Sequence, residues 1–406
     1  MGWEEEYKLD VTIPLLISPP ASFLLPLPLR LKDGACSSHP VTSIAFLLSS
    51  FPTRVSYQMA PPSLVLAAGV AALLAGNNVA AYPIPYNDLN GGRIEVQAHR
   101  GGLGLRNEES LWAFAYALEI GVDTLEMDTV FTKDGVPVIW HDHYIYPTKC
   151  TGDYVGEYIN NLTLAQVKSL DCDLQLEAHP QQEIHPGTKI ATLEEVLELV
   201  NCYGDKGVTI NLETKIDPTT PEQTWPIEKY VELIPIIEKH GFLERTYIQS
   251  FDWRTLVLIH EKYPSIPIVA LLDDTTVVPD ANGTYPWLGG LNLDDYDGDW
   301  VAAAAAIGSS VLSPVHGFPS NLTVNSPGYT PFTTKEVVDE AHELGMKVIP
   351  WTVDYEVTIS KLMDDGVDSI ISNYPERVIA VARQRGLSVG RARNPSKPEC
   401  LAKASA

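Results

Sequence analysis

The sequence predicts an α/β fold, a closed (β/α)8 barrel, and three observations lead to that class. From residue 94 onward, strand-like apolar segments alternate with helical segments, which indicates a parallel sheet with helical crossovers. Eight such units fit into about 300 residues, the usual size of this barrel. Polar motifs also stand at the ends of several predicted strands, where such a barrel carries its reactive residues.

The expected elements follow one another in regular order. The eight predicted strands begin at or near Ile94, Thr124, Val208, Tyr247, Ile266, Val311, Lys347 and Asp368. The helical segments between them include residues 110–121, 192–200, 227–240, 253–263, 301–308, 334–345 and 356–366. A doubly wound open sheet is the alternative arrangement. It would lead us to expect a glycine-rich nucleotide loop, which the sequence lacks.

One junction departs from this rhythm. Only "TKDG" (residues 132–135) separates the apolar segments 125–131 and 136–142. Four residues are too few for a parallel crossover, and these four favour a turn. We therefore expect an accessory antiparallel β-hairpin beside the TIM-type barrel, followed by an inserted loop region over residues 144–190.

The first 81 residues differ in character from the rest. Residues 59–81 contain an apolar core of about a dozen residues and end in Val79-Ala80-Ala81, as a secretory signal peptide does. We interpret residues 1–58 as a mis-assigned or disordered N-terminal extension, with translation starting at Met59. Residues 82–390 are then the catalytic domain and residues 391–406 a C-terminal tail.

Charge and hydrophobic patterning narrow the choice of partners. The formal net charge is −24 and no run of Lys and Arg occurs, which argues against nucleic acid and acidic membranes. The apolar stretches before residue 81 are too short to span a bilayer, and the C-terminal end lacks the apolar tail of a lipid anchor. We expect no stable membrane anchor, and the oligomeric state remains open.

Cysteines and sequons fit an extracellular protein. Beyond residue 81 the chain has an even number of cysteines: Cys150, Cys172, Cys202 and Cys400. Four cysteines allow three pairings, and Cys150 with Cys172 is our guess. Such a bridge would stabilise the fold by about 3 kcal/mol under the chain-entropy model. Three N-x-S/T sequons, at Asn161, Asn282 and Asn321, are glycosylation candidates.

The polar residues at the first two strand ends suggest chemistry. His99 and Arg100 end the first strand, and Gly101 and Gly102 let the backbone turn sharply or a ligand approach closely. Glu126 and Asp128 end the second strand two residues apart, so both carboxylates point to the same side of it. Because two carboxylates this close repel each other, the pair predicts a cation bound between them.

The third barrel strand repeats this spacing. In "NLETK", Glu213 and Lys215 lie on one side, so Glu213 can complete a site of three carboxylates and Lys215 can meet a phosphate oxygen. Oxygen-only ligation favours one divalent cation, Ca²⁺ or Mg²⁺, over zinc. The hairpin returns His141 toward the same rim.

Each motif has an ordinary structural explanation when it stands alone. An E-x-D pair is more often an ion-pair partner, His141 can be a surface histidine, and Lys215 can neutralise a carboxylate. Four such motifs at the predicted strand ends of one barrel face favour a common site.

Together these motifs resemble a known family. "AHRGG", "ALEIGVDTLEMDTVFTKDGVPVIWHD", "TLEEVL", "NLETK", "QSF" and "PWTVD" are similar to the glycerophosphodiester phosphodiesterases, which are relatives of the phosphatidylinositol-specific phospholipases C. The resemblance spans residues 94–378. Two stretches depart from the family pattern: residues 107–110 read N-E-E-S instead of P-E-N-T, and residues 372–375 read S-N-Y-P instead of T-D-R-P.

The resemblance implies a secreted phosphoric diester hydrolase that converts glycerophosphodiesters to glycerol 3-phosphate and an alcohol. It further implies that the substrate's own glycerol hydroxyl attacks first, giving a cyclic phosphate that water opens. The implied roles are acid and base for His99 and His141, phosphate contacts for Arg100 and Lys215, and metal ligands for Glu126, Asp128 and Glu213.

Less specific expectations surround this site. Trp351 is a candidate wall of the alcohol pocket, although a core tryptophan is nearly as common. Gln249 and Phe251 are similarly placed. The insertion, which carries His179 and His185, is a candidate lid.

Two rival functions stay open. One keeps the barrel and metal but cleaves lysophospholipids or sphingomyelin as a phospholipase D does. The other is a non-catalytic extracellular binding protein on the same scaffold.

Overall fold

The computed structural model describes residues 92–404. The predicted N-terminal extension (1–58) and signal peptide (59–81) lie outside the described residues, as do residues 82–91 of the predicted domain.

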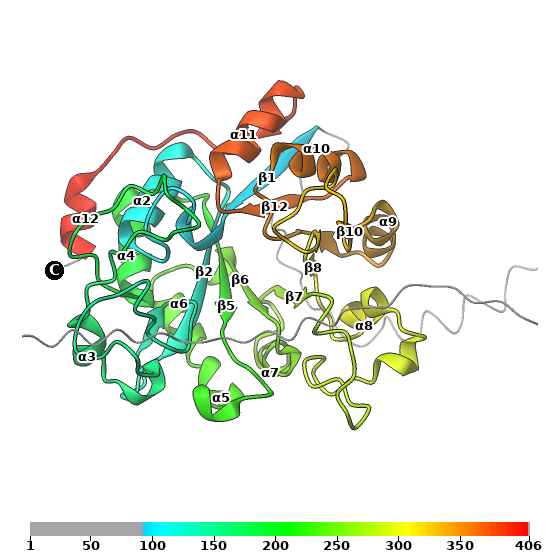
Figure 1. Ribbon diagram of the computed structural model, residues 1–406, viewed down its shortest axis with the longest axis horizontal. Coiled ribbons are helices and arrows are strands. Elements are labelled where there is room, and N and C mark those ends of the chain that lie inside the picture. The colour runs from blue at the N-terminus through cyan, green and yellow to red at the C-terminus, as the bar shows by residue number, and fades with distance from the viewer. Residues whose placement is uncertain (1–91, 405–406) are drawn as a thin grey trace, which may run out of the picture. The chain divides into compact units, whose positions relative to one another are not determined.

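Eight parallel strands form the centre of the protein (Figure 1). They are β1 (Arg93–Ala98), β2 (Thr124–Phe131), β5 (Thr209–Thr214), β6 (Thr246–Ser250), β7 (Ile268–Leu272), β8 (Val311–Pro314), β11 (Lys347–Val348) and β12 (Ser369–Ser372). Their order is β11-β8-β7-β6-β5-β2-β1-β12, and each neighbouring pair is parallel. All eight begin within two residues of the predicted positions.

Backbone hydrogen bonds between the first and last strands of this order close the ring. The Asp368 amide donates to the Val348 carbonyl (3.0 Å), and the Ile371 amide donates to the Pro350 carbonyl (3.1 Å). The chain after β11 therefore runs beside β12, and the sheet is a closed (β/α)8 barrel as the sequence predicts.

Strand β2 shows how the sequence divides the two faces of the ring. Leu125 and Met127 belong to the large apolar core, which also includes side chains from the surrounding helices. Glu126 and Asp128 alternate with them and are also buried. Because successive strand residues point to opposite faces, this alternation directs both carboxylates into the barrel.

Eleven helices are described. They are α2 (Leu111–Ile120), α3 (Leu164–Lys168), α4 (Leu193–Tyr203), α5 (Ile227–Tyr230), α6 (Leu233–Lys239), α7 (Trp253–Lys262), α8 (Trp300–Ala306), α9 (Lys335–Glu343), α10 (Glu356–Asp365), α11 (Pro375–Gln384) and α12 (Pro398–Ala404). Side-chain caps fix several starts. Ser110 accepts from the Ala113 amide, and Thr192 and Glu195 form a capping box at α4.

The single helix predicted over residues 227–240 is wrong, because the structure divides it into α5 and α6. Pro235 lies in the first turn of α6 and has no amide hydrogen to donate to the Val231 carbonyl. A continuous helix would require that bond, so the chain turns between the two short helices instead.

The accessory hairpin is confirmed. Strand β3 (Pro137–Ile139) pairs antiparallel with β2, with Thr129 opposite Ile139. Strand β4 (Ala191–Thr192) pairs antiparallel with β3 and leads directly into α4. Three further short strands are β9 (Gly317–Phe318), β10 (Thr330–Pro331) and β13 (Ser388–Val389).

The insertion over residues 144–190 has an apolar cluster of its own. Ile145, Val167 and Leu170 pack there, and a Cys150–Cys172 disulfide joins its two halves, as in the pairing we guessed. The loop is therefore a small packed unit beside the barrel.

The C-terminal segment is part of the same folded body. After β13 the chain passes to α12, which packs against α2 and α4 (Figure 1). A Cys202–Cys400 disulfide and an ion pair between Arg391 and Asp205 hold it there.

The three candidate glycosylation sites lie on the surface. Asn161, Asn282 and Asn321 are all exposed and lie outside the strands of the barrel. Among residues 92–404, no helix is both long enough and apolar enough to cross a bilayer.

Candidate active site

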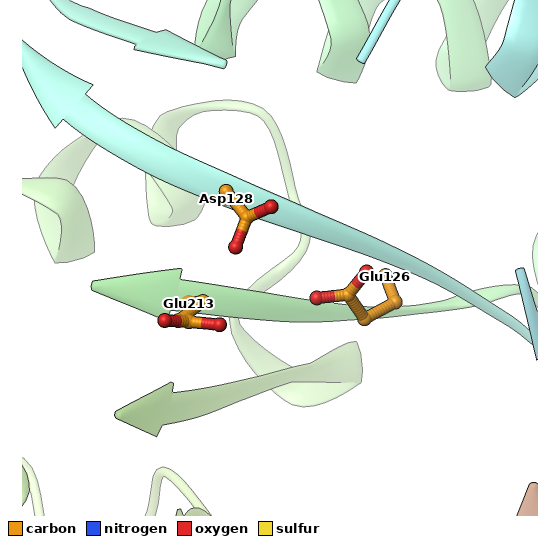
Figure 2. A group of neighbouring side chains, drawn as sticks. All are labelled: Glu126, Asp128 and Glu213. Carbon is orange, nitrogen blue, oxygen red and sulfur yellow. The ribbon is translucent and has the colours of Figure 1, made fainter. Parts of the chain in front are cut away.

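Three carboxylates gather at the ends of two adjacent strands. Glu126 and Asp128 come from β2 and Glu213 from β5, and Figure 2 shows the three side chains facing one another. The strand register places Asp128 directly opposite Glu213. One oxygen from each residue lies within 4.8 Å of the others, and all three residues are buried.

This cluster fits a hard divalent cation. Burial and the charge of Asp128 raise the pKa of Glu126 well above its ordinary value, and burial raises that of Glu213 to about 8. Three buried carboxylates so close together oppose one another's ionisation, and a cation would relieve that repulsion. Oxygen-only ligands are those preferred by Ca²⁺ and Mg²⁺.

Two cationic side chains flank the carboxylates. Lys215 Nζ lies 2.7 Å from Glu213 Oε1 and 3.7 Å from Asp128 Oδ1. Arg100 Nη1 donates to Glu108 Oε2 (2.7 Å), and Arg100 Nε lies 3.2 Å from Asp128 Oδ2. Arg100 therefore connects Glu108 with one carboxylate of the cluster.

His99 begins a short 3₁₀ turn (His99–Gly101) at the end of β1. Arg100 has a left-handed backbone (φ 51°), and its amide donates to Glu126 Oε2 (2.8 Å). Residue 101 must be glycine, because a Cβ at this position would lie only 2.7 Å from the Cβ of Ala113. The turn therefore packs tightly against α2 while its backbone holds a carboxylate.

The tautomer of His99 follows from its neighbours. Asn373 Nδ2 donates to Asp354 Oδ2 (2.7 Å), so the amide oxygen of Asn373 faces His99. That oxygen lies 2.6 Å from His99 Nδ1, which must therefore carry the hydrogen. In the neutral ring, His99 Nε2 is left with its lone pair.

His141 has a charged partner instead. Its Nδ1 lies 2.9 Å from Asp142 Oδ1, and the other oxygen of Asp142 accepts from Lys149 Nζ (2.5 Å). Lys149 also pairs with Glu108. The side chain of Asp142 therefore holds both an imidazole and an ammonium group.

The surroundings of both imidazoles favour their neutral form. Burial and the adjacent Arg100 cation lower the pKa of His99 to about 3. Burial, Arg100 and Lys215 lower the pKa of His141 to about 4, against the opposing effects of Asp128 and Asp142. An anionic substrate between them would raise both pKa values again.

A cavity joins these groups. It is lined by His99, Arg100, Glu126, His141, Glu213, Lys215, Gln249, Phe251, Leu271, Trp351, Thr352 and Ile371. Trp351 and Phe251 meet edge to face, with ring centroids 5.3 Å apart, and form its apolar wall. Gln249 donates to Glu126 Oε1 (2.7 Å), so it orients a carboxylate.

Every residue predicted for the chemistry lies at or beside this cavity, Asp128 through its contacts with Lys215 and Arg100. The two histidines of the insertion do not line it. His179 lies 3.0 Å from the hydroxyl of Tyr374, and His185 stacks on Trp112.

Sequence reasoning missed four supporting residues: Asn373, Asp354, Lys149 and Glu109. For Glu109 a signal existed, because it stands where the family often has asparagine. Glu109 has a left-handed backbone (φ 59°), which asparagine tolerates well. Burial and the nearby Asp128 and Glu126 raise the pKa of Glu109 well above its ordinary value. Glu109 Oε1 accepts a hydrogen bond from the backbone amide of Asp128 (3.0 Å), so Glu109 supports a residue of the carboxylate cluster.

Known proteins are similar to this chain in sequence. The chain is 29% identical over 295 residues to a glycerophosphodiester phosphodiesterase of Caldanaerobacter subterraneus subsp. tengcongensis, covering 72% of this chain and 98% of that protein. It is 27% identical over 293 residues to a glycerophosphodiester phosphodiesterase of Bacillus subtilis, covering 71% and 87%.

Solved structures agree. A crystal structure from Silicibacter pomeroyi, named as a candidate glycerophosphoryl diester phosphodiesterase, superposes with a TM-score of 0.61 at 28% identity, over 74% of this chain and 98% of that one. A sequence profile of the glycerophosphoryl diester phosphodiesterase family matches residues 99–377, more than half of the 406 residues. The protein therefore belongs to the glycerophosphoryl diester phosphodiesterase family.

Proposed function

We propose that the protein is a secreted, divalent-metal-dependent glycerophosphodiester phosphodiesterase that produces glycerol 3-phosphate and an alcohol. One observation carries the proposal: three buried carboxylates, two histidines and two cationic side chains surround a single cavity. The names of the relatives support the same reaction class.

The cationic groups address the main obstacle to phosphodiester hydrolysis, the negative charge of the substrate. Glu126, Asp128 and Glu213 would hold a Ca²⁺ or Mg²⁺ ion, which supplies charge stabilisation to the phosphoryl oxygens when bound. Arg100 and Lys215 line the same cavity and can donate hydrogen bonds to those oxygens.

His99 is suited to act as the general base. Its neutral amide partner fixes the ring with the lone pair of Nε2 free, and burial keeps the ring neutral. We propose that Nε2 takes the proton of the glycerol 2-hydroxyl as that oxygen attacks phosphorus.

His141 is suited to act as the general acid. A carboxylate partner stabilises the imidazolium form, which an acid must reach before it donates. As the bond from phosphorus to the leaving oxygen breaks, His141 Nε2 donates its proton to that oxygen. One P–O bond forms and one breaks, and the product is a cyclic glycerol phosphate.

The second half-reaction reverses these roles. His141 removes a proton from water, whose oxygen attacks the phosphorus of the cyclic phosphate. The bond from phosphorus to the glycerol 2-oxygen breaks, and His99 returns its proton to that oxygen. Glycerol 3-phosphate leaves with both histidines restored to their starting states.

Purified protein incubated with a panel of glycerophosphodiesters, with and without chelator, tests the proposal. We expect release of glycerol 3-phosphate that chelation abolishes and that Ca²⁺ or Mg²⁺ restores. Phosphorus NMR should detect the cyclic intermediate. Chelator-insensitive hydrolysis would refute the metal requirement.

The same assay separates the rivals. Long-chain lysophospholipids and sphingomyelin belong in the panel, and preferential cleavage of either would favour the D-type alternative. Absence of turnover on every substrate, in a protein that still binds a divalent cation by calorimetry, would favour the non-catalytic binding protein.

Secretion is supported by the two disulfides and by exposed sequons at Asn161, Asn282 and Asn321. Expression of the full chain in a secreting host, followed by N-terminal sequencing of the secreted protein, tests it. A mature chain beginning near Tyr82 is the expected result, and one beginning near Gly2 would contradict the signal peptide.

A further inference from the structure

A second recess adjoins the catalytic cavity. Its volume is about 540 Å³, and it is lined by His141, Asp142, His143, Tyr144, Tyr146, Tyr158, Lys215 and Gln223. His141 and Lys215 line the catalytic cavity as well. The recess therefore lies on the far side of two groups that the proposed function places at the phosphate.

Three tyrosines of the insertion give the recess an aromatic wall. The ring centroids of Tyr144 and Tyr146 lie 4.9 Å apart at 63°, and those of Tyr144 and Tyr158 lie 5.5 Å apart at 74°. Rings at such large interplanar angles form a corner whose aromatic faces point in different directions. In a parallel stack, only the two outer faces would be exposed.

The backbone holds these rings in place. Tyr144 and Tyr158 form an isolated antiparallel bridge, flanked by hydrogen bonds from the Ile145 amide to the Glu157 carbonyl (3.0 Å) and from the Ile159 amide to the His143 carbonyl (2.8 Å). The Cys150–Cys172 disulfide secures the same loop. The backbone that carries Tyr144 and Tyr158 is thus fixed by pairing, which lowers the cost of ordering this part of the recess around a ligand.

The positions of the two histidines indicate which part of the substrate enters the recess. His99 lines only the catalytic cavity, whereas His141 lines both. In an in-line displacement the attacking and leaving oxygens are on opposite sides of phosphorus. If His141 protonates the leaving oxygen, the remainder of the leaving alcohol extends past His141 into the tyrosine-lined recess.

Charge and surface chemistry favour a cationic group there. Aromatic faces attract alkylammonium ions, most strongly those whose own hydrogen-bonding demand is small, such as a quaternary ammonium. The carboxylate of Asp142 on the wall is already paired with Lys149 and His141, so the aromatic faces are the main attraction for a cation. The formal net charge of −24 favours cations over anions generally. Lys215 stands at the phosphate end, where the substrate is anionic.

We propose that Tyr144, Tyr146 and Tyr158 form a subsite for the quaternary ammonium head of the leaving alcohol, so that glycerophosphocholine is a preferred substrate. This inference rests on the proposed function, since it assigns the leaving group of that reaction.

The test compares kcat/KM for glycerophosphocholine with kcat/KM for glycerophosphoglycerol, which shares the phosphodiester but has a neutral head. Tyr146→Ala and Tyr158→Ala should each lower this ratio about 2- to 10-fold, mainly through the KM for the choline diester. Tyr146→Phe and Tyr158→Phe keep the aromatic faces and should keep the ratio within about twofold. Tyr355→Ala is the control, because Tyr355 is 43% exposed, close to the 45% of Tyr146, and lines neither cavity.

The variants must melt within a few degrees of the wild type, as judged by circular dichroism, and the phenylalanine variants remain informative if an alanine variant does not fold. A ratio unchanged in both alanine variants would overturn the subsite while leaving the proposed function intact. Equal losses in the phenylalanine variants would also overturn it, because they would show that the hydroxyl groups, and not the aromatic faces, select the choline diester. Wild-type protein that hydrolyses no diester would overturn the proposed function and the subsite together.

Discussion

The surroundings of His99 and His141 differ in the atom that each imidazole Nδ1 meets. His99 faces the amide oxygen of Asn373, whereas His141 faces the carboxylate of Asp142. A neutral amide orients a ring without adding charge, and a carboxylate both orients it and stabilises its protonated form. Two identical side chains, both partly buried and both near Arg100, are thereby suited to opposite proton transfers.

A single carboxylate connects the two regions. Glu108 pairs with Arg100, the residue after His99, and also with Lys149, which holds Asp142. The carboxylate that orients His141 and the residue that follows His99 therefore belong to the same ion-pair network. Substitutions at either histidine, at Asp142 or at Glu108 test the role of each group separately.

The largest effect is expected from removing either histidine. His99→Ala and His141→Ala should each reduce kcat by about 10²- to 10⁴-fold, because each deletes one proton transfer. A p-nitrophenyl leaving group needs little protonation, so this substrate should recover most of the rate of His141→Ala and little of the rate of His99→Ala. The reverse pattern in steady-state rates would exchange the two assignments.

The next largest effect is expected in stability from Glu108→Gln. Burial alone would raise the pKa of Glu108, but Arg100 and Lys149 lower it to about 2, compared with an ordinary value of 4.5. A lowered folded-state pKa stabilises the fold above pH 4.5, and this contribution disappears as the pH falls through about 2.

The variant should therefore lose about 3 kcal/mol of unfolding free energy at pH 7, and the difference should shrink toward pH 2. Urea denaturation at several pH values measures this. Glu177→Gln, at an exposed glutamate, should show no such dependence. A deficit of the same size at every pH would mean that the loss is steric and not electrostatic.

The smallest effect is expected from Asp142→Asn, which gives His141 the kind of partner that His99 has. Burial already lowers the pKa of His141 to about 4, and loss of the carboxylate should lower it further. Less of the acid is then protonated, so kcat with alkyl leaving groups should fall about tenfold and its basic limb should move to lower pH. The pH–rate profile measures both, and an upward shift would contradict the role of Asp142.

The sequence predicts the barrel and the reacting groups well because both are local patterns. Glu126 with Asp128, and Glu213 with Lys215, are two residues apart, so strand geometry alone places each pair on one face. The hairpin follows from a four-residue turn. Strand alternation then brings separate motifs to one rim without any further information.

The supporting residues could not be predicted in this way. Asn373 contacts His99 although the two residues are 274 positions apart, and no local sequence pattern at either residue predicts this contact. Only the closure of β12 against β1 brings them together. The division of the predicted helix near Pro235 could have been predicted, because a proline inside a helix removes a backbone hydrogen bond and commonly interrupts the helix.

The Cys202–Cys400 disulfide has a practical consequence for producing this protein. It closes a loop with a sequence separation of 198 residues, which corresponds to about 5 kcal/mol of destabilisation of the unfolded chain in the loop-entropy treatment. A bacterial cytosol, where thiols stay reduced, would yield material without this clasp. An oxidising expression route, or refolding with a glutathione redox couple, is therefore the sensible starting point for purification.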